Sequence, residues 1–229
     1  MTDHFRSKKR TEAQSRLESI YSDIRARICL LDYTPGSRVP EGMLCKEFGL
    51  SRTPIRRVLT RLEAEGLIET LHGDGTYVTN VSPDLLNEVY QLRMELAPLF
   101  GRLSPQSPSP QTLAHLRDTR SQIAELIGHP NLRKFAQLNI EYYLTLTSLI
   151  GNRPLREITE KLFLQTSRIW LMQLPELDWD EVMKAVGKEI SHVVTALESG
   201  DMEAVGLFSR LNIQHTMHRY LIPEKSKSC

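Results

Sequence analysis

The stretch Gly49-Leu-Ser-Arg-Thr-Pro-Ile-Arg-Arg-Val-Leu-Thr-Arg61 decides how the first third of this sequence folds. Gly49 is a typical helix terminator, Ser51 is a candidate helix N-cap, and Pro54 suits a first helical turn. These signals predict that one helix ends at Gly49 and that the next runs over about residues 53–65. Its apolar residues recur at three- and four-residue steps, which indicates one buried face. They are Ile55, Val58, Leu59 and Leu62.

The rest of this predicted helix is basic. Four arginines lie between residues 51 and 61, and the segment contains no acidic residue; they are Arg52, Arg56, Arg57 and Arg61. Arg52, Arg56 and Thr60 are four residues apart and share one helical face. Arginine bonds guanine in the major groove, while a helix N-terminus and the hydroxyls of Ser51 and Thr53 bond phosphate. The pattern favours a DNA-reading helix, and the alternative for the helix alone is a solvated charged face.

The neighbouring segments favour the DNA-reading interpretation. Residues 11–31 carry apolar residues at helical spacing, and residues 41–48 form a second, short helix. After the basic helix, two β-prone runs at 67–71 and 76–79 flank the turn His72-Gly73-Asp74-Gly75, a pattern typical of a hairpin. This order within about 80 residues predicts a winged helix-turn-helix over residues 1–80.

Everything after Pro83 is predicted to be helical, so residues 81–229 form an all-α bundle of six to seven helices and the fold class is mainly α. Pro98 is expected to kink or end the first segment, and the proline-rich stretch 104–110 is interpreted as a stiff connector. The predicted helical segments are 83–103, 110–127, 131–150, 153–173, 178–198 and 201–220.

Composition excludes several other classes of protein. The 229 residues are 40% hydrophobic and 25% charged, as in ordinary globular proteins. No run approaches the roughly 20 apolar residues of a membrane span, and the charged N-terminus lacks the apolar segment of a signal peptide. We therefore expect a cytoplasmic protein with no membrane partner, whose first ten residues form a frayed tail or else touch nucleic acid. Cys29, Cys45 and Cys229 have no paired spacing, so neither a disulfide framework nor a zinc site is expected.

The charge is nearly balanced. Residues 1–80 hold 13 Lys+Arg and 11 Asp+Glu, a net charge of +2, and the remaining 16 and 17 give −1. Weak non-specific DNA binding is expected, so operator recognition depends on direct contacts and dimer geometry. The sequence contains no Gly-x-Ser-x-Gly, HExxH, phosphate-loop or dinucleotide motif, and we expect no enzyme activity.

The first third of the sequence resembles the DNA-binding domain of GntR-family bacterial transcription regulators. The matching residues are Pro35-Gly-Ser-Arg38, Glu41, Leu44, residues 49–56, Leu59, Arg61-Leu-Glu-Ala-Glu-Gly-Leu67 and Gly75-Thr-Tyr-Val78. The resemblance implies that Arg52, Thr53 and Arg56 contact bases or nearby phosphates, and that His72-Gly73 approaches the minor groove. Arg57 departs from the family, which usually has Glu there. The candidate DNA-binding residues are Arg38, Ser51, Arg52, Thr53, Arg56, Arg57, Thr60, His72 and Gly73.

A second departure lies in the turn of the wing. Asp74 stands where a basic or neutral residue is common, and its negative charge is expected to weaken phosphate contact at that point.

The helical remainder is similar to the FCD effector domain of the FadR-like branch of that family. The similarity rests on Val89-Tyr-Gln-Leu-Arg93, Leu149-Ile-Gly-Asn-Arg-Pro154, Glu189 and Ala196-Leu-Glu-Ser-Gly-Asp201. Such domains bind small molecules, often carboxylates, and many hold a divalent metal through an Asp and three His. Transfer of that site gives Asn139, Tyr143, Ile190 and Asn212. Isoleucine has no lone pair, and neutral Asn and Tyr are poor metal ligands, so no metal or other cofactor is expected.

Helical periodicity independently indicates a polar pocket. Asn139 interrupts the inward face of segment 131–150, otherwise formed by Phe135, Tyr142, Tyr143, Leu146 and Ile150; Asn212 lies on the inward line Val205, Phe208, Leu211 and His215 of the last segment. Buried amides need partners: each other, water or a ligand. The alternative is a polar pair that fixes helix register.

Four charged or titratable side chains are considered in relation to this pocket. Arg93 and Arg168 are candidates to bind an acidic effector, although surface salt bridges are the commoner fate of arginines. His215 is expected to line the pocket, and His192 to point away from it and be partly exposed. The candidate effector-binding residues are Arg93, Asn139, Tyr143, Arg168, Ile190, Asn212 and His215.

The sequence therefore predicts a sequence-specific DNA-binding regulator. We expect a homodimeric repressor that reads a pseudo-palindromic double-stranded operator, with an affinity set by a small-molecule effector of unknown identity. The alternative is a regulator whose helical domain only dimerises and binds no effector.

Overall fold

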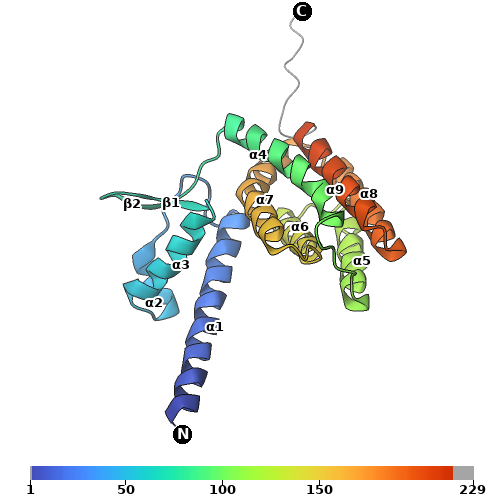
Figure 1. Cartoon of the computed structure of the whole chain (residues 1–229). Coiled ribbons are helices and arrows are strands. Elements are labelled where there is room, and N and C mark those ends of the chain that lie inside the picture. Colours follow the sequence, from blue (N-terminus) through green and yellow to red (C-terminus); the bar gives the residue numbers. More distant parts are fainter. Residues whose placement is uncertain (1, 219–229) are drawn as a thin grey trace, which may run out of the picture. The chain divides into compact units, whose positions relative to one another are not determined.

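The computed structural model describes residues 2–218, and their side chains from Glu12 onward. Cys229 lies outside the described residues, and the first ten residues, expected to form a frayed tail, are helical from Thr2 onward. The chain divides into two compact units, residues 1–80 and 81–229 (Figure 1). The mainly α fold class, with one antiparallel hairpin after a helix-turn-helix, is confirmed.

The first unit is built from three helices and a hairpin. α1 (Thr2–Cys29) begins earlier than the predicted residue 11, and α2 (Glu41–Phe48) ends at Gly49, whose φ of 61° is left-handed, as helix termination at glycine requires. α3 (Arg52–Ala64) follows after a short turn. The buried side chains of α1 and α3 form the core of the unit: Ile20, Ile24, Ile28, Ile55, Val58, Leu59 and Leu62.

The wing is a hairpin whose second strand has an additional partner. β1 (Ile68–Leu71) pairs antiparallel with β2 (Gly75–Val78), with Ile68 opposite Val78. On the other edge of β2, Arg38 forms an isolated bridge with Tyr77, and the Val39 amide donates to the Thr76 carbonyl at 2.8 Å. The loop before α2 is thereby fixed to the wing, which the sequence analysis did not predict.

The second unit is a helical bundle. Its described α-helices are α4 (Pro83–Leu96), α5 (Pro110–Ala124), α6 (Leu132–Thr147), α7 (Arg153–Gln173), α8 (Trp179–Ser199) and α9 (Met202–Thr216). Serine, aspartate or asparagine side chains cap α4, α5, α6, α7, α8 and α9 at the N-terminus, each accepting a hydrogen bond from a backbone amide. Two short 3-10 turns, η1 (Ala97–Gly101) and η2 (Leu174–Glu176), complete the unit.

Two features of this bundle refine the sequence predictions. Pro98 does end the regular part of the first segment, because α4 stops at Leu96 and η1 follows. On α9 the predicted inward line was partly wrong: Leu211 is 41% exposed, and the buried positions are Val205, Gly206, Ser209 and Ile213. The helix is rotated so that its small residues pack against η1, where a Cβ on Gly206 would lie 2.9 Å from the Ala97 carbonyl oxygen.

Candidate DNA interface and effector pocket

The outer face of α3 is exposed along its whole length. Ser51 occupies the N-cap position in an extended conformation, but its side chain makes no capping hydrogen bond, so the hydroxyl is available to another acceptor or donor. The four apolar residues predicted to face inward are buried. The predicted DNA-binding residues are all exposed: Arg38, Ser51, Arg52, Thr53, Arg56, Arg57, Thr60, His72 and Gly73.

The four arginines between residues 51 and 61 are not equivalent, which corrects the expectation that no acid opposes them. Arg56 Nε donates to Glu41 Oε1 at 3.1 Å. Arg61 is exposed and lies beside α1, where its Nη1 donates to Glu18 Oε2 at 2.6 Å and its guanidinium stacks 3.4 Å from the Tyr21 ring centroid. Glu18 and Glu41 come from α1 and α2, so the local sequence around α3 gives no sign of them, whereas Glu65, 3.6 Å from Arg61 Nε, lies four residues after Arg61.

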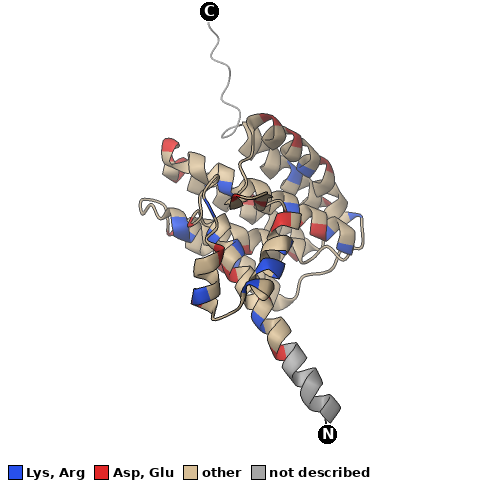
Figure 2. Cartoon of the chain, turned by 90° about the vertical axis from the view of Figure 1, so that its left-hand side faces the viewer, with Lys and Arg blue, Asp and Glu red and all other residues tan. Residues whose placement is uncertain are grey.

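Arg52 and Arg57 differ from Arg56 and Arg61 in their surroundings. Within the described residues, neither makes an ion pair with an acidic side chain, and both are exposed. Elsewhere, Figure 2 shows Lys and Arg interspersed with Asp and Glu over the helices. The uncompensated positive charge of α3 is therefore concentrated at its N-terminal half, which also carries the positive end of the helix dipole.

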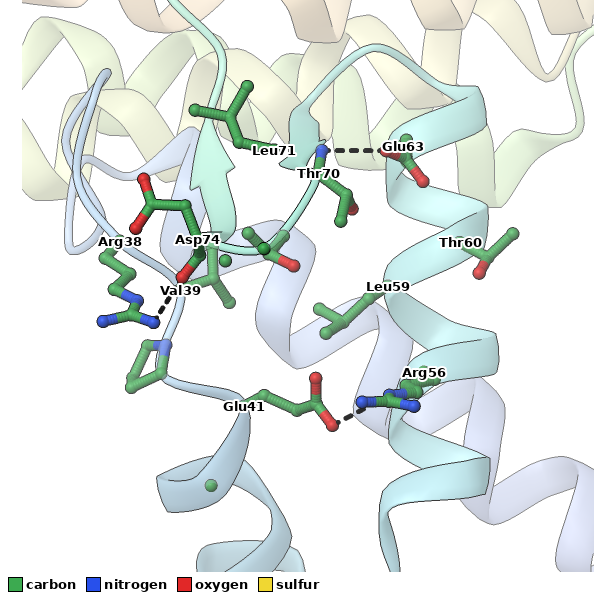
Figure 3. A pocket seen from close by; sticks show the side chains of 15 residues that line it. Arg38, Val39, Glu41, Arg56, Leu59, Thr60, Glu63, Thr70, Leu71 and Asp74 are labelled. Atoms are coloured by element: carbon green, nitrogen blue, oxygen red, sulfur yellow. Dashed lines mark hydrogen bonds and ion pairs between the residues drawn. The ribbon is translucent and has the colours of Figure 1, made fainter.

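A cleft of about 710 Å³ separates α3 from the wing (Figure 3). Arg38 reaches across to the wing, donating from Nη2 to the Asp74 carbonyl at 2.6 Å, while the Asp74 carboxylate accepts from the Tyr77 hydroxyl at 3.0 Å. On the opposite wall, Glu63 accepts from the Thr70 amide at 2.9 Å. Acidic and basic side chains therefore both border the cleft. The basic ones are Arg38 and Arg56.

A buried tyrosine supports α3 from behind. The Tyr21 hydroxyl donates to the Glu65 carboxylate, 2.7 Å from Oε1, and accepts from Arg25 Nη1 at 3.1 Å. Burial and this hydrogen bond raise the pKa of Tyr21 to about 12. The network connects α1 to the C-terminal end of α3 and so fixes the orientation of the helix.

The helical unit contains a small internal cavity of about 90 Å³ between α4, α6, α7, α8 and α9. Five of the predicted effector residues line it: Arg93, Asn139, Tyr143, Ile190 and Asn212. Glu189, Tyr142 and Ser167 also contribute to the wall. The inward faces that periodicity predicted for Asn139, Tyr143 and Asn212 therefore meet at one cavity.

Arg93 is the basic residue of this cavity wall, and it is 7% exposed. Its Nη1 donates to Thr166 Oγ1 at 2.9 Å, and its guanidinium lies 4.9 Å from the Tyr90 ring centroid and 5.5 Å from that of Phe163. Within the described residues, Nε has no hydrogen-bond partner and no carboxylate lies in ion-pair range. This buried cation is surrounded by aromatic rings and neutral hydroxyls, including those of Tyr90 and Tyr143, and no described carboxylate balances its charge.

Aromatic residues form much of the remaining wall. Tyr143 stacks on Phe163 with ring centroids 3.8 Å apart. The Tyr142 hydroxyl is buried without a hydrogen-bond partner among the described residues. Burial, reinforced by the charge of Glu189, raises the pKa of Tyr142, so this hydroxyl stays protonated and retains a proton to donate.

Two predicted effector residues lie elsewhere. Arg168 is completely buried but does not line the cavity, and the surface salt bridge considered for it is excluded by that burial. His215 does not line the cavity either; its Nδ1 lies 3.8 Å from Glu189 Oε1, and its side chain is 43% exposed. His192, as predicted, points away and is half-buried, with its ring 5.2 Å from that of Phe208.

Models of known protein families match both units of the chain. The model for gntR-family bacterial regulatory proteins matches residues 16–78, and the FCD domain model matches residues 88–215. The chain belongs to the GntR family and carries an FCD domain. The second match covers more than half of the chain, and it contains every residue that lines the internal cavity except Thr216.

Relatives of this GntR-family chain are named as regulators. It is 31% identical over 134 residues to the Nta operon transcriptional regulator of Aminobacter aminovorans, covering 57% of this chain and 63% of that one. It is 25% identical over 170 residues to the probable D-xylose utilization operon transcriptional repressor of Paenarthrobacter nicotinovorans, covering 73% and 72%. The first match therefore spans less than two thirds of its relative.

A solved structure shares the fold. E. coli McbR/YncC aligns with a TM-score of 0.75 over 89% of this chain and 95% of that one, at 20% sequence identity. Separately, among the described residues no helix is long and apolar enough to cross a membrane.

The metal that many FCD domains hold does not fit the residues present. Its expected positions are Asn139, Tyr143, Ile190 and Asn212, and the Ile190 side chain, 1% exposed, puts hydrocarbon where an imidazole is needed. The described part of the chain also contains no cluster of three or more His, Cys, Asp or Glu side chains that could hold a metal ion.

Sequence reasoning missed several members of the cavity wall. Phe163, Ser167 and Trp170 of α7 all line it, and their spacing at i, i+4 and i+7 is the signal that would have identified them. Tyr90 lies one helical turn before Arg93 and was detectable in the same way.

Proposed function

We propose that this chain is a sequence-specific DNA-binding transcriptional regulator that reads its operator with α3. The observation that carries the proposal is the exposed α3 face, whose Arg52 and Arg57 carry uncompensated charge above a fully buried apolar face. Arg52, Thr53 and Arg56 are assigned to bases or nearby phosphates in the major groove. The remaining candidate contacts are to phosphates from Arg38, Ser51, Arg57 and Thr60, and to the minor groove from His72 and Gly73.

The proposed operator is double-stranded and pseudo-palindromic. One α3 reads about one half-site, so a homodimer is needed to read a site long enough for specific recognition, and its two-fold symmetry dictates that of the DNA. The near-neutral charge of the chain supports this assignment, because weak non-specific binding leaves direct contacts and dimer geometry to supply affinity.

A small-molecule effector is proposed to bind the internal cavity and to lower operator affinity, making the protein a repressor released by its ligand. The repressor role is supported by the naming of the Paenarthrobacter relative. The effector is supported by Arg93, because a buried guanidinium with no carboxylate partner among the described residues favours binding of an anionic group.

Fluorescence anisotropy with the DNA upstream of the protein's own gene tests the proposal. Wild-type protein is expected to bind that DNA far more tightly than a scrambled sequence. Arg153→Ala on α7, an exposed residue that forms an ion pair with Glu157, is the matched control for Arg52→Ala and should bind normally. Equal affinity for the two DNAs would overturn the assignment. Organic acids that neither release DNA in the same assay nor shift Tm in thermal unfolding would favour a helical unit that serves only for dimerisation.

A further inference from the structure

The wing has no lysine or arginine of its own. Residues 67–79, which form the hairpin and its ends, contain two acidic side chains, Glu69 and Asp74, and neither of the two strongly basic residue types. DNA carries about one negative charge per 1.7 Å of helix axis, so its phosphates repel a segment of this composition. A wing that approaches the DNA backbone therefore needs a cation from another part of the chain.

Arg38, from the loop before α2, brings a cation to the turn of the wing (Figure 3). Its backbone forms an antiparallel bridge with Tyr77, and residues paired in this way place their side chains on the same face. Its Nη2 donates to the Asp74 carbonyl at 2.6 Å, which uses only one of the N–H donors of the guanidinium. The side chain is exposed, so the remaining donors can bind a phosphate.

The Asp74 carboxylate is held on the wing itself. It accepts a hydrogen bond from the Tyr77 hydroxyl at 3.0 Å, and this bond raises the pKa of Tyr77. Asp74 therefore offers its carbonyl to Arg38 while its carboxylate stays bound to Tyr77. The side chain that was expected to weaken phosphate contact belongs to the same cluster as the cation that can restore it.

Gly75 leaves the space that the Arg38 guanidinium occupies. A Cβ on Gly75 would lie 2.8 Å from Arg38 Nε and 3.0 Å from Nη2. Both nitrogen atoms are at the far end of a flexible side chain, so a methyl group at this position would displace the guanidinium. The φ of Gly75 is 152°, which side chains rarely adopt, so the same methyl group would also strain the turn. An experiment must separate these two effects.

We propose that Arg38 makes the contact of the wing with the DNA backbone, and that Gly75 is the positioning residue that lets its guanidinium dock on the turn. The phosphate concerned borders the minor groove, because His72 and Gly73 of the same turn are assigned to that groove. This inference rests on the proposed function, which assigns Arg38 to a phosphate, and adds the surface from which Arg38 acts. It follows that Arg38 and Gly75 act on DNA as one unit.

A double-mutant cycle read out by salt dependence tests this unit. Anisotropy with the DNA upstream of the protein's own gene is measured at several salt concentrations for Arg38→Gln, Gly75→Ala and the double variant. Loss of one phosphate contact should lower the slope of log K against log salt by about 0.9 in each single variant. Because Gly75 acts through Arg38, the double variant should lose no more affinity and no more slope than Arg38→Gln alone. Lys184→Gln, at an exposed position of α8, removes the same charge and should keep the wild-type slope.

Ethylation of single operator phosphates locates the contact. An ethyl group on one phosphate that borders the minor groove should weaken binding of the wild type and leave Arg38→Gln unaffected. Interference that Arg38→Gln loses only at phosphates of the major groove would overturn the placement of Arg38 on the wing.

The remaining outcomes are distinct. Additive losses in the double variant, or a lower Tm with an unchanged slope in Gly75→Ala, would show that Gly75 acts only through strain in the turn. An unchanged slope in folded Arg38→Gln would overturn the contact and leave operator reading by α3 standing. A wild-type protein that binds the upstream DNA no better than a scrambled sequence would overturn the proposed function, and this inference with it.

Discussion

Arg56 Nε lies 3.1 Å from Glu41 Oε1, so this arginine of α3 is held by the first residue of α2 (Figure 3). The Arg56 side chain is 65% exposed, and its ion pair contributes little to stability, about 0–1 kcal/mol. Its effect is on position and charge: Glu41 orients Arg56 and masks part of its attraction for phosphate. A contact of this kind makes binding to arbitrary DNA weaker without removing the donor that reads a base.

We expect Glu41→Gln to lower discrimination between DNA sequences. Affinity for random DNA should rise several-fold as Arg56 is released, while operator affinity rises less. Competition anisotropy with operator and random duplexes measures the ratio. Glu18→Gln removes the same charge from the partner of Arg61 and is the control. The same fall in discrimination in both variants would show that total charge, and not the Arg56 contact, is responsible.

Arg57 is expected to contribute a phosphate contact that does not depend on sequence. Arg57→Ala should weaken binding to operator and random DNA by similar factors and lower the slope of log K against log salt by about one. Titrations at several salt concentrations give the slope. A loss confined to the operator would instead assign Arg57 to base recognition.

Tyr21 makes stability depend on pH in the alkaline range. Its pKa is about 12 in the folded state against 10.0 in the unfolded state, so the neutral hydroxyl stabilises the fold fully below pH 10 and that contribution is lost as pH rises through 12. Tyr21→Phe should cost about 1–2 kcal/mol at pH 8 by removing the bond to Glu65, and the difference from wild type should shrink above pH 10. Urea unfolding at pH 8 and pH 11 tests this, and a constant difference would contradict it.

Two glycines of the helical unit should respond oppositely to alanine. A Cβ on Gly101 would lie 2.2 Å from the Met202 carbonyl oxygen, so Gly101→Ala should separate η1 from α9 and cost about 1–3 kcal/mol. A Cβ on Gly187 would meet nothing within 4 Å, and Gly187→Ala in the interior of α8 should stabilise by about 0.5–1 kcal/mol. Thermal unfolding of both variants measures the difference, and shifts of the same sign would refute the packing argument.

Arg93 is expected to contribute to ligand binding and not to the stability of the fold. Arg93→Met keeps most of the side-chain volume and removes a buried charge that no carboxylate in the described part of the chain balances, so Tm should stay equal or rise. Any increase in Tm caused by an acidic ligand should disappear in the same variant. A fall of several degrees without ligand would identify Arg93 as a structural residue.

The features that were predicted well from the sequence depend on patterns between neighbouring residues. The spacing of apolar residues placed Asn139, Tyr143 and Asn212 around one cavity, and the family resemblance added Ile190; all four line it. Capping and helix-breaking residues likewise gave the bounds of α2 and α7. These signals are contained within single segments.

Contacts between distant segments were not predictable in this way. The partner of Arg56 lies 15 residues away and that of Arg61 lies 43 residues away, and no local pattern marks either acid. The burial of Arg168 and the exposure of Leu211 depend on how α7 and α9 are rotated within the bundle. Packing between helices sets that rotation, and it can bury a charged residue and expose an apolar one.

The operator affinity of Arg52→Ala tests the central claim most directly. Arg52 is exposed at the first position of α3 and makes no ion pair within the described residues, so its loss should leave Tm within about a degree while removing a DNA contact. Anisotropy with the upstream DNA should show a loss of ten-fold or more in operator affinity and a smaller loss for random DNA, since one base contact is worth about 1–3 kcal/mol. Unchanged operator affinity in a folded Arg52→Ala protein would contradict the assignment of α3 as the DNA-reading helix.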